Sequence, residues 1–95
     1  MKKKIIANEI EYELINDYKE GFDTDSVVPK ITDYFEPYDY IVGDWAYGKL
    51  RLKGFCEKNN KIYNQINDYV NAEKYIKDNC SYECRYFILR KINNM

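Results

Sequence analysis

The sequence predicts an α+β domain, with a mostly antiparallel sheet of about five strands and two helices on one face of that sheet. Three observations support this prediction. Apolar and polar residues alternate with a strand period near the N-terminus, two segments carry apolar residues at helical spacing, and 84–92 is rich in β-branched and aromatic residues. The elements follow in the order β-β-α-β-β-α-β, without repeats or a long linker, so residues 1–95 are expected to form a single domain.

The first two strands are expected at 3–7 and 10–15, joined by a turn at Asn8-Glu9. In the second strand, Ile10, Tyr12 and Leu14 alternate with glutamates, as in a strand that buries one face. A polar connection at 16–23 follows. The sheet is therefore expected to begin with a hairpin.

The next element is expected to be a helix within the segment TDSVVPKITDYFEP, which follows the polar connection. Asp25 or Ser26 is the expected N-cap, and Pro29 is tolerated only within the first turn. Three apolar residues then share one face, namely Val28, Ile31 and Phe35. Pro37 ends the helix, because the residue before a proline is disfavoured in the α region.

The segment YDYIVGDWAYGKLRLKGF, residues 38–55, is expected to form a central hairpin around a Tyr47-Gly48 turn. In this register Asp44 faces Arg51 and Trp45 faces Leu50. One face is apolar and carries Ile41, Trp45, Leu50 and Leu52. The other face is mixed and carries Asp44, Lys49, Arg51 and Lys53, with Tyr40, Val42 and Phe55 beside them. A shift of one residue would mix the two sets, so the pattern favours this register.

The rest of the chain is expected to hold one short strand at 61–63, a helix at 67–79 and a largely buried strand at 84–92. Asn67 is the expected cap of the helix. Its apolar stripe is expected to consist of Tyr69, Ala72 or Glu73, Ile76 and Cys80.

Several classes of protein are excluded by what the sequence lacks. It has no histidine, which removes the commonest general base and metal ligand. Its four glycines stand in no phosphate-binding motif. No apolar run approaches the roughly 20 residues that span a bilayer, and the apolar run after Lys4 is shorter than the about 7–15 residues of a signal peptide. We therefore expect no cofactor, no membrane and a cytoplasmic location.

The three cysteines are expected to be free thiols without a metal. Cys80 and Cys84 have the most metal-like spacing, but a structural zinc site needs four ligands and Cys56 would supply only a third thiolate. Both are expected to act as small buried hydrophobes. A redox role for Cys80 and Cys84 stays open.

Charge is distributed unevenly along the chain. Eleven acidic and two basic residues lie between Glu9 and Asp44, whereas five acidic and ten basic residues follow from Trp45 onward. Such an asymmetry fits either a polyanionic partner or neutralisation of one half by the other across the fold. We favour neutralisation, because the net charge is −1 and nucleic-acid binders are usually basic.

Two groups of residues are candidates for a site. Glu20, Asp23 and Asp25 could bind a divalent cation or do acid–base work, or simply form a solvated loop before a helix cap. Asp44 inside a hydrophobic strand needs a partner, and Arg51 is placed to supply one. This pair is either a cross-strand ion pair on the solvent face or part of a flat ligand surface formed with Lys49, Lys53, Tyr40 and Phe55.

Three segments stand out as a set: YKEGFD at 18–23, YDYIVGDWAYGKLRLKGF at 38–55 and CSYECRYFILRK at 80–91. In this order they resemble the YutD-like family, small uncharacterised proteins of low-GC Gram-positive bacteria. The family typically has arginine at the position of Lys19 and glycine at those of Ala46 and Glu83. The glycine lost at Ala46 reshapes the hairpin tip slightly, and Glu83 departs from a tight turn between Cys80 and Cys84. The resemblance implies a cytoplasmic α+β domain and transfers no catalytic residue.

These observations favour a non-enzymatic binding module that engages a protein or ribonucleoprotein partner through the polar face of the 38–55 hairpin. One alternative is direct binding of RNA or single-stranded DNA by basic residues, namely Lys49, Arg51, Lys53, Arg85, Arg90 and Lys91. Another is a small carboxylate-based enzyme that uses Glu20, Asp23 and Asp44, with or without a divalent metal. A convex basic face would favour binding, whereas a deep pocket gathering Asp23, Asp44 and Arg51 would favour the enzyme.

Overall fold

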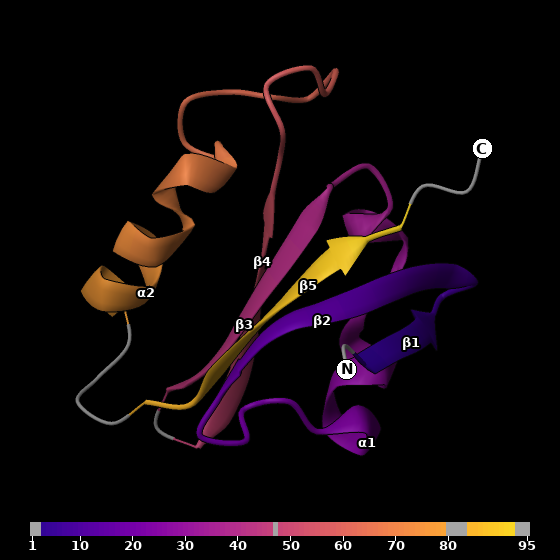
Figure 1. Cartoon of the computed structure of the whole chain (residues 1–95), viewed down its shortest axis with the longest axis vertical. Coiled ribbons are helices and arrows are strands. Elements are labelled where there is room, and N and C mark those ends of the chain that lie inside the picture. The colour runs from indigo at the N-terminus through magenta and orange to yellow at the C-terminus, as the bar shows by residue number, and fades with distance from the viewer. Residues whose placement is uncertain (1–2, 47, 80–83, 93–95) are drawn as a thin grey trace.

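The computed structural model describes residues 3–46, 48–79 and 84–92. Within these residues the fold is built on a five-stranded sheet in the order β1-β2-β5-β3-β4, and all neighbouring strands are antiparallel (Figure 1). The strands are β1 (Lys3–Ala7), β2 (Ile10–Tyr18), β3 (Tyr40–Ala46), β4 (Lys49–Phe55) and β5 (Tyr86–Lys91). The predicted α+β class with a mostly antiparallel sheet is confirmed.

Helical segments lie in the connections from β2 to β3 and from β4 to β5. They are α1 (Thr24–Val27) and α2 (Ala72–Asn79), with three short 3₁₀ turns at η1 (Val28–Lys30), η2 (Asp33–Phe35) and η3 (Tyr69–Asn71). Figure 1 shows α2 on one side of the sheet, and α1 with its following turns on the other.

The two helices therefore cover opposite faces, and the expectation that both lie on one face is wrong. Ile41 of β3 packs in one core cluster with Val27 of α1, whereas its neighbour Val42 packs in another with Ile76 of α2. Successive side chains of a strand point to opposite faces. Both faces need a cover because β3 and β5 lie inside the sheet and are buried on both sides.

The segment before β3 also differs from its prediction, since it forms three short turns instead of one helix. The N-cap of α1 is Asp23, not Asp25 or Ser26. This earlier start puts Pro29 beyond the first turn, where in a continued α-helix its ring would clash with the carbonyl four residues back, so the α-helix ends before it. Ile31 and Phe35 are still buried in the predicted core.

The central hairpin has the predicted register. Asp44 pairs with Arg51, and Trp45 pairs with Leu50. The apolar face is less buried than expected, because Trp45, Leu50 and Leu52 are only half-buried. Tyr47 of the expected turn lies outside the described residues.

The second helical segment begins at a different cap. Asp68, not Asn67, accepts a hydrogen bond from the backbone N–H of Val70. The short strand expected at 61–63 does not form, and Lys61 and Ile62 lie in a turn instead. Cys80, the last residue of the expected stripe, lies outside the described residues.

Candidate functional site

Asp44 and Arg51 form a buried ion pair at the centre of the candidate surface. Arg51 Nε and Nη2 donate to the two carboxylate oxygens of Asp44, at 3.1 and 2.8 Å. Asp44 is only 1% exposed. Its carboxylate lies near Tyr75 on α2, and the burial of Tyr75, together with the negative charge of Asp44, raises the pKa of Tyr75. The predicted pairing is confirmed, but the pair lies beside α2 and not on an open solvent face.

The aromatic residues expected to flank this pair are covered. Tyr40 stacks on Tyr69, with ring centroids 3.6 Å apart, and its hydroxyl donates to Glu57 at 2.6 Å. Burial and this hydrogen bond raise the pKa of Tyr40. Phe55 is fully buried and packs edge-on against Tyr75. A flat ligand surface that includes Tyr40 and Phe55 is therefore not what the fold presents.

The three bases of this face remain accessible and lie on the edge strand β4. Lys49 is exposed, and the side chain of Arg51 is 41% exposed. Lys53 is half-buried, with its ammonium 5.5 and 5.7 Å from the ring centroids of Phe55 and Tyr75. We call Lys49, Arg51 and Lys53 the β4 basic row.

The later bases have partners in the acidic part of the chain. Arg90 forms an ion pair with Glu13, and Lys91 donates to the backbone carbonyl of Glu36. Together with Asp44–Arg51, the Arg90–Glu13 ion pair fits the interpretation that the two halves of the chain neutralise each other. Arg85 lies over the ring of Trp45, 4.5 Å from its centroid.

Glu20 and Asp23 line a polar cavity of about 410 Å³ together with Asp17, Phe22, Trp45 and Arg85. Asp25 is not among its lining residues. Asp23 is already engaged as the cap of α1, since its Oδ2 accepts from the backbone N–H and the hydroxyl of Ser26 at 3.1 and 2.6 Å.

The carboxylates proposed for an enzyme are not brought together. Trp45 lines the cavity that holds Glu20 and Asp23, whereas Asp44, its neighbour in β3, points to the opposite face of the sheet. In the part of the chain that the structure describes, no group of three or more acidic or cysteine side chains could hold a metal ion.

The three segments that carry the family resemblance meet beside this cavity. The indole N–H of Trp45 donates to the carbonyl of Gly21 at 2.7 Å, and the Trp45 backbone N–H donates to the carbonyl of Arg85 at 3.1 Å. Gly21 lies so close to β5 that an added Cβ would be 2.5 Å from the Tyr86 carbonyl oxygen. The three segments thus contact one another directly, and these contacts give them a structural role.

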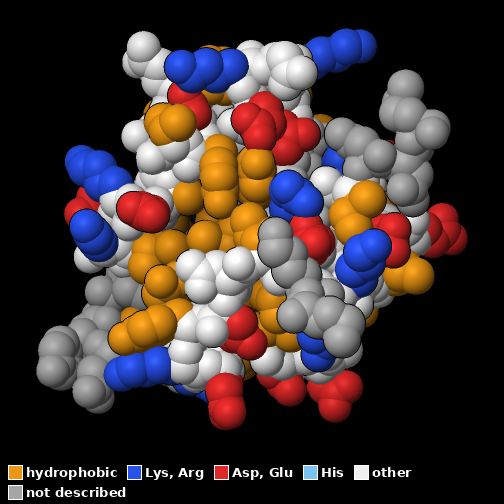
Figure 2. All heavy atoms as spheres, in the orientation of Figure 1, with side chains coloured by type: hydrophobic (Ala, Val, Ile, Leu, Met, Phe, Trp, Pro, Cys, Tyr) orange, Lys and Arg blue, Asp and Glu red, His pale blue; other side chains and the backbone are white. Residues whose placement is uncertain are grey.

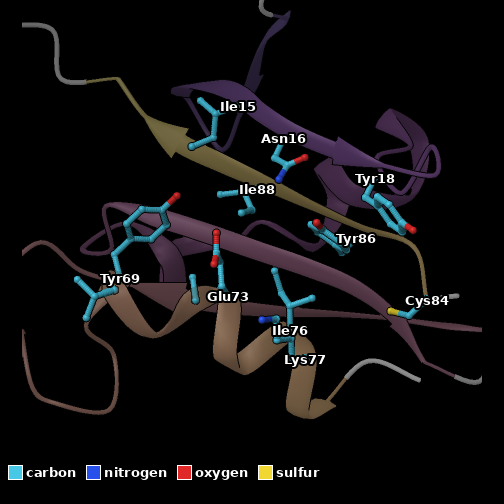
Figure 3. A pocket seen from close by; sticks show the side chains of 12 residues that line it. Ile15, Asn16, Tyr18, Tyr69, Glu73, Ile76, Lys77, Cys84, Tyr86 and Ile88 are labelled. Carbon is cyan, nitrogen blue, oxygen red and sulfur yellow. The ribbon is translucent and has the colours of Figure 1, made fainter. Parts of the chain in front are cut away.

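Sequence reasoning missed a larger hollow on the other face. A groove of about 710 Å³ lies between α2 and the β2–β5 half of the sheet, and we call it the α2 groove (Figure 3). Its apolar lining includes Ile15, Ile76 and Ile88, and its aromatic lining Tyr18, Tyr69 and Tyr86. These residues come from β2, α2 with its preceding turn, and β5, so their spacing in the sequence gave no signal before the sheet order was known.

The cysteines depart from the prediction of three free thiols. Cys56 is free and buried, and burial raises its pKa. Cys84 is disulfide-bonded, which corrects the prediction for that residue and removes the thiol argument for a reducing compartment. Cys80 lies outside the described residues.

No helix in the described ranges is long and apolar enough to cross a bilayer.

Comparison with known proteins identifies the family. Residues 6–90 match the family model described as "Putative antitoxin YutD-like". The chain is 38% identical over 88 residues to "Putative antitoxin YutD" of Bacillus subtilis (strain 168), an alignment that covers 93% of this chain and 97% of that protein. The solution NMR structure of yutD from B. subtilis superimposes with a TM-score of 0.80 at 35% identity, and covers 98% of this chain and 84% of that one. The chain belongs to the YutD-like family.

Proposed function

We propose that this chain is a cytoplasmic, non-enzymatic module that binds a protein, either alone or within a ribonucleoprotein, through the β4 basic row. The description of its family and its relative as putative antitoxins supports a protein partner, because an antitoxin counteracts a toxin. The partner surface that fits the row is acidic. The observation that carries the proposal is the bidentate contact of Asp44 with Arg51, which fixes one charge of the row.

Fixed charges suit recognition. Alternate residues of a strand lie about 6.8 Å apart on one face, so the row places the ammonium groups of Lys49 and Lys53 on either side of the guanidinium that Asp44 pairs. Arg51 is held by Asp44, and Lys53 lies over two aromatic rings. Side chains that are already ordered lose less entropy on binding, and charge complementarity speeds association with the correct partner.

The same face is less suited to single-stranded nucleic acid. Such sites combine basic residues with exposed aromatic rings on which bases stack. Here Tyr40 is already stacked on Tyr69, and Phe55 is fully buried. These contacts favour a protein partner over direct binding of RNA or single-stranded DNA.

A charge-reversal pair tests the proposal. Affinity-tagged wild type, Lys49→Glu/Lys53→Glu and the control Lys30→Glu/Lys58→Glu are expressed in cells that naturally make the protein. Lys30 and Lys58 are exposed and lie outside β4, so the control changes the net charge equally. We expect wild type and control to retain a protein from the cytoplasmic fraction after nuclease treatment, and the β4 variant to lose it. Higher salt should weaken the complex.

Thermal melts check that each variant is folded, because Lys53 lies over two aromatic rings and its replacement could destabilise the protein. If the double variant unfolds, Lys49→Glu alone is used for the binding test. Equal recovery of the partner by all folded variants would refute the β4 row as the contact surface. Release of the partner by nuclease would favour the nucleic-acid alternative instead.

A further inference from the structure

The face of the sheet that carries α2 is only half covered by it. Ala72 and Ile76 of α2 pack in one core cluster with Tyr40, Val42 and Phe55 of β3 and β4, and the cluster reaches Ile88 of β5. The β2–β5 half of this face forms the floor of the α2 groove. Figure 2 shows hydrophobic side chains gathered in the middle of the molecule with charged side chains around them, in the region where Figure 1 places the space between α2 and β2.

An irregularity in β2 shapes this floor. The register of β2 against β5 shifts between Leu14 and Asn16, so one extra residue, Ile15, is inserted. Beyond the bulge, Tyr18 pairs with Tyr86 and stacks on it in the groove, with ring centroids 5.0 Å apart. Without the bulge, simple alternation would turn Tyr18 to the α1 face. Bulges commonly redirect side chains near functional sites.

The groove has the dimensions of a helix. Two adjacent strands span about 10 Å across the sheet, and an α-helix with its side chains is about 10–12 Å wide. The groove also follows one stripe of the α2 segment, since Tyr69, Glu73 and Ile76 line it at intervals of four and three residues, and Lys77 lines it four residues after Glu73. This stripe extends over roughly 12 Å, the length of about two helical turns, so a helix of two to three turns matches it.

An extended peptide does not fit this floor. β2 is paired with β1 and β5, and β5 is paired with β2 and β3, so neither strand offers a free edge along the groove. A bound strand would have no backbone partners there, whereas a helix satisfies its backbone hydrogen bonds internally.

The charges along α2 would set the direction in which a bound helix lies in the groove. Glu73 and Lys77 both line the groove, as Figure 3 shows, and neither takes part in an ion pair among the described residues. Lys74 and Asp78 on the same helix pair with each other and do not line the groove. A helix beside α2 would place a base opposite Glu73 and an acid opposite Lys77, as flanking charges do between paired helices.

We infer that the α2 groove binds an amphipathic helix of a partner protein, with apolar residues against the accessible lining residues Ile15, Tyr18 and Val70 and a basic and an acidic residue against Glu73 and Lys77. This inference rests on the proposed function only in that the chain binds a protein. It concerns a second surface, because the β4 basic row includes no residue that lines the groove.

Helical peptides test the inference without knowledge of the partner. The probe is a displayed library of helical peptides with leucines fixed at i, i+3, i+4 and i+7 and with randomised flanking positions. Peptides selected on the wild type are measured against Val70→Glu, Glu73→Lys/Lys77→Glu and the control Lys74→Asp/Asp78→Lys. Val70 lines the groove and is 73% exposed, so Val70→Glu is expected to leave the core unchanged.

We expect both groove variants to weaken the selected peptides by about tenfold or more, and the control to leave their affinity unchanged. A peptide with its flanking charges exchanged should recover affinity for Glu73→Lys/Lys77→Glu, which a loss of folding could not produce. Lys49→Glu/Lys53→Glu should bind the peptides as the wild type does, so failure of the proposed function and failure of this inference are distinguishable.

Three results would overturn the inference. The first is that no helical peptide is enriched, or that enriched peptides bind Val70→Glu and the wild type equally. The second is that a library of extended peptides yields the groove-dependent binders instead. The third is a dimer in sedimentation equilibrium that Val70→Glu abolishes, because the groove would then hold a second copy of this chain.

Discussion

The two faces of the sheet are covered in different ways. On the α1 face, α1 and the short turns after it close over the apolar centre, and Val27, Ile31 and Phe35 pack against Ile41, Phe87 and Leu89. On the α2 face, one helix packs over β3, β4 and Ile88 of β5, while the rest of the β2–β5 half lines a groove. The buried Asp44–Arg51 pair also lies on this second face.

This difference separates residues that hold the fold from residues that are free to bind. A side chain packed on all sides stabilises the protein, whereas a side chain supported from below and open above can contact another molecule without loss of stability. Changes on the α1 face should therefore act on the free energy of unfolding. Changes in the groove should act on binding.

The largest contrast is expected between Phe35→Ala and Tyr18→Ala. Phe35 is 7% exposed within the α1-face core, so its truncation should lower the free energy of unfolding by about 3–5 kcal/mol. Tyr18 is 43% exposed in the groove, so its truncation should lower it by about 1 kcal/mol or less. Urea unfolding of both variants measures the contrast. Similar losses for the two would contradict the division between the faces.

Removal of Arg51 should be the largest effect on the α2 face. Arg51→Met leaves the Asp44 carboxylate buried without its cation, and should lower the free energy of unfolding by about 3 kcal/mol. The double variant Asp44→Asn/Arg51→Met removes both charges and should recover most of this loss. If the double variant is as unstable as Arg51→Met, the pair acts through packing and not through charge.

Alkaline pH should test both faces through their tyrosines. Burial, with a contribution from Glu36, raises the pKa of Tyr12 to about 12, above the ordinary value of 10.0. The folded state therefore holds the Tyr12 proton more tightly than the unfolded state does. The stability from this proton is complete below pH 10 and is lost as the pH rises towards 12, a change on the order of 2 kcal/mol.

Phenylalanine variants separate the two tyrosines. The Tyr12 hydroxyl is buried and has no hydrogen-bond partner among the described residues, so Tyr12→Phe should be neutral or stabilising at pH 7 and should flatten the alkaline loss. Tyr40→Phe loses the hydrogen bond to Glu57 and should cost about 1 kcal/mol at pH 7. Denaturant melts between pH 7 and 12 measure both effects. An unchanged alkaline slope in Tyr12→Phe would contradict this assignment.

The smallest expected effect concerns the acidic candidates. Asp23→Ala removes the cap of α1 and should lower the free energy of unfolding by about 1 kcal/mol. The control Asp25→Ala changes an exposed residue of the same turn and should stay within about 0.5 kcal/mol. Thermal melts compare the two. An equal effect of both would show that charge near the turn matters more than the cap.

The sequence alone predicts the features that depend on local pattern. The register of the central hairpin follows from the need to separate Trp45 and Leu50 from Asp44 and Arg51, and the structure has that register. The first hairpin likewise forms around Asn8 and Glu9, which both adopt positive φ, as a two-residue type I′ turn requires.

Features that depend on the order of strands could not be predicted in this way. The apolar runs of β3 and β5 are nearly continuous, and such runs are typical of strands covered on both faces. The positions of β3 and β5 within the sheet decide which helix covers which face. These positions are set by contacts between residues that are distant in sequence. The α2 groove escaped prediction for the same reason, since Ile15 and Ile88 become neighbours only when β5 pairs with β2.

The position of β5 in the sheet has a consequence for synthesis of the chain. In the described sheet β5 is the strand that joins the β1–β2 hairpin to the β3–β4 hairpin, and it follows both in the sequence. During translation, β2 and β3 therefore leave the ribosome with one edge each still unpaired, and such edges promote aggregation. A nascent chain that stops before Tyr86 holds two hairpins and no complete sheet. Completion of the described sheet thus depends on the arrival of β5.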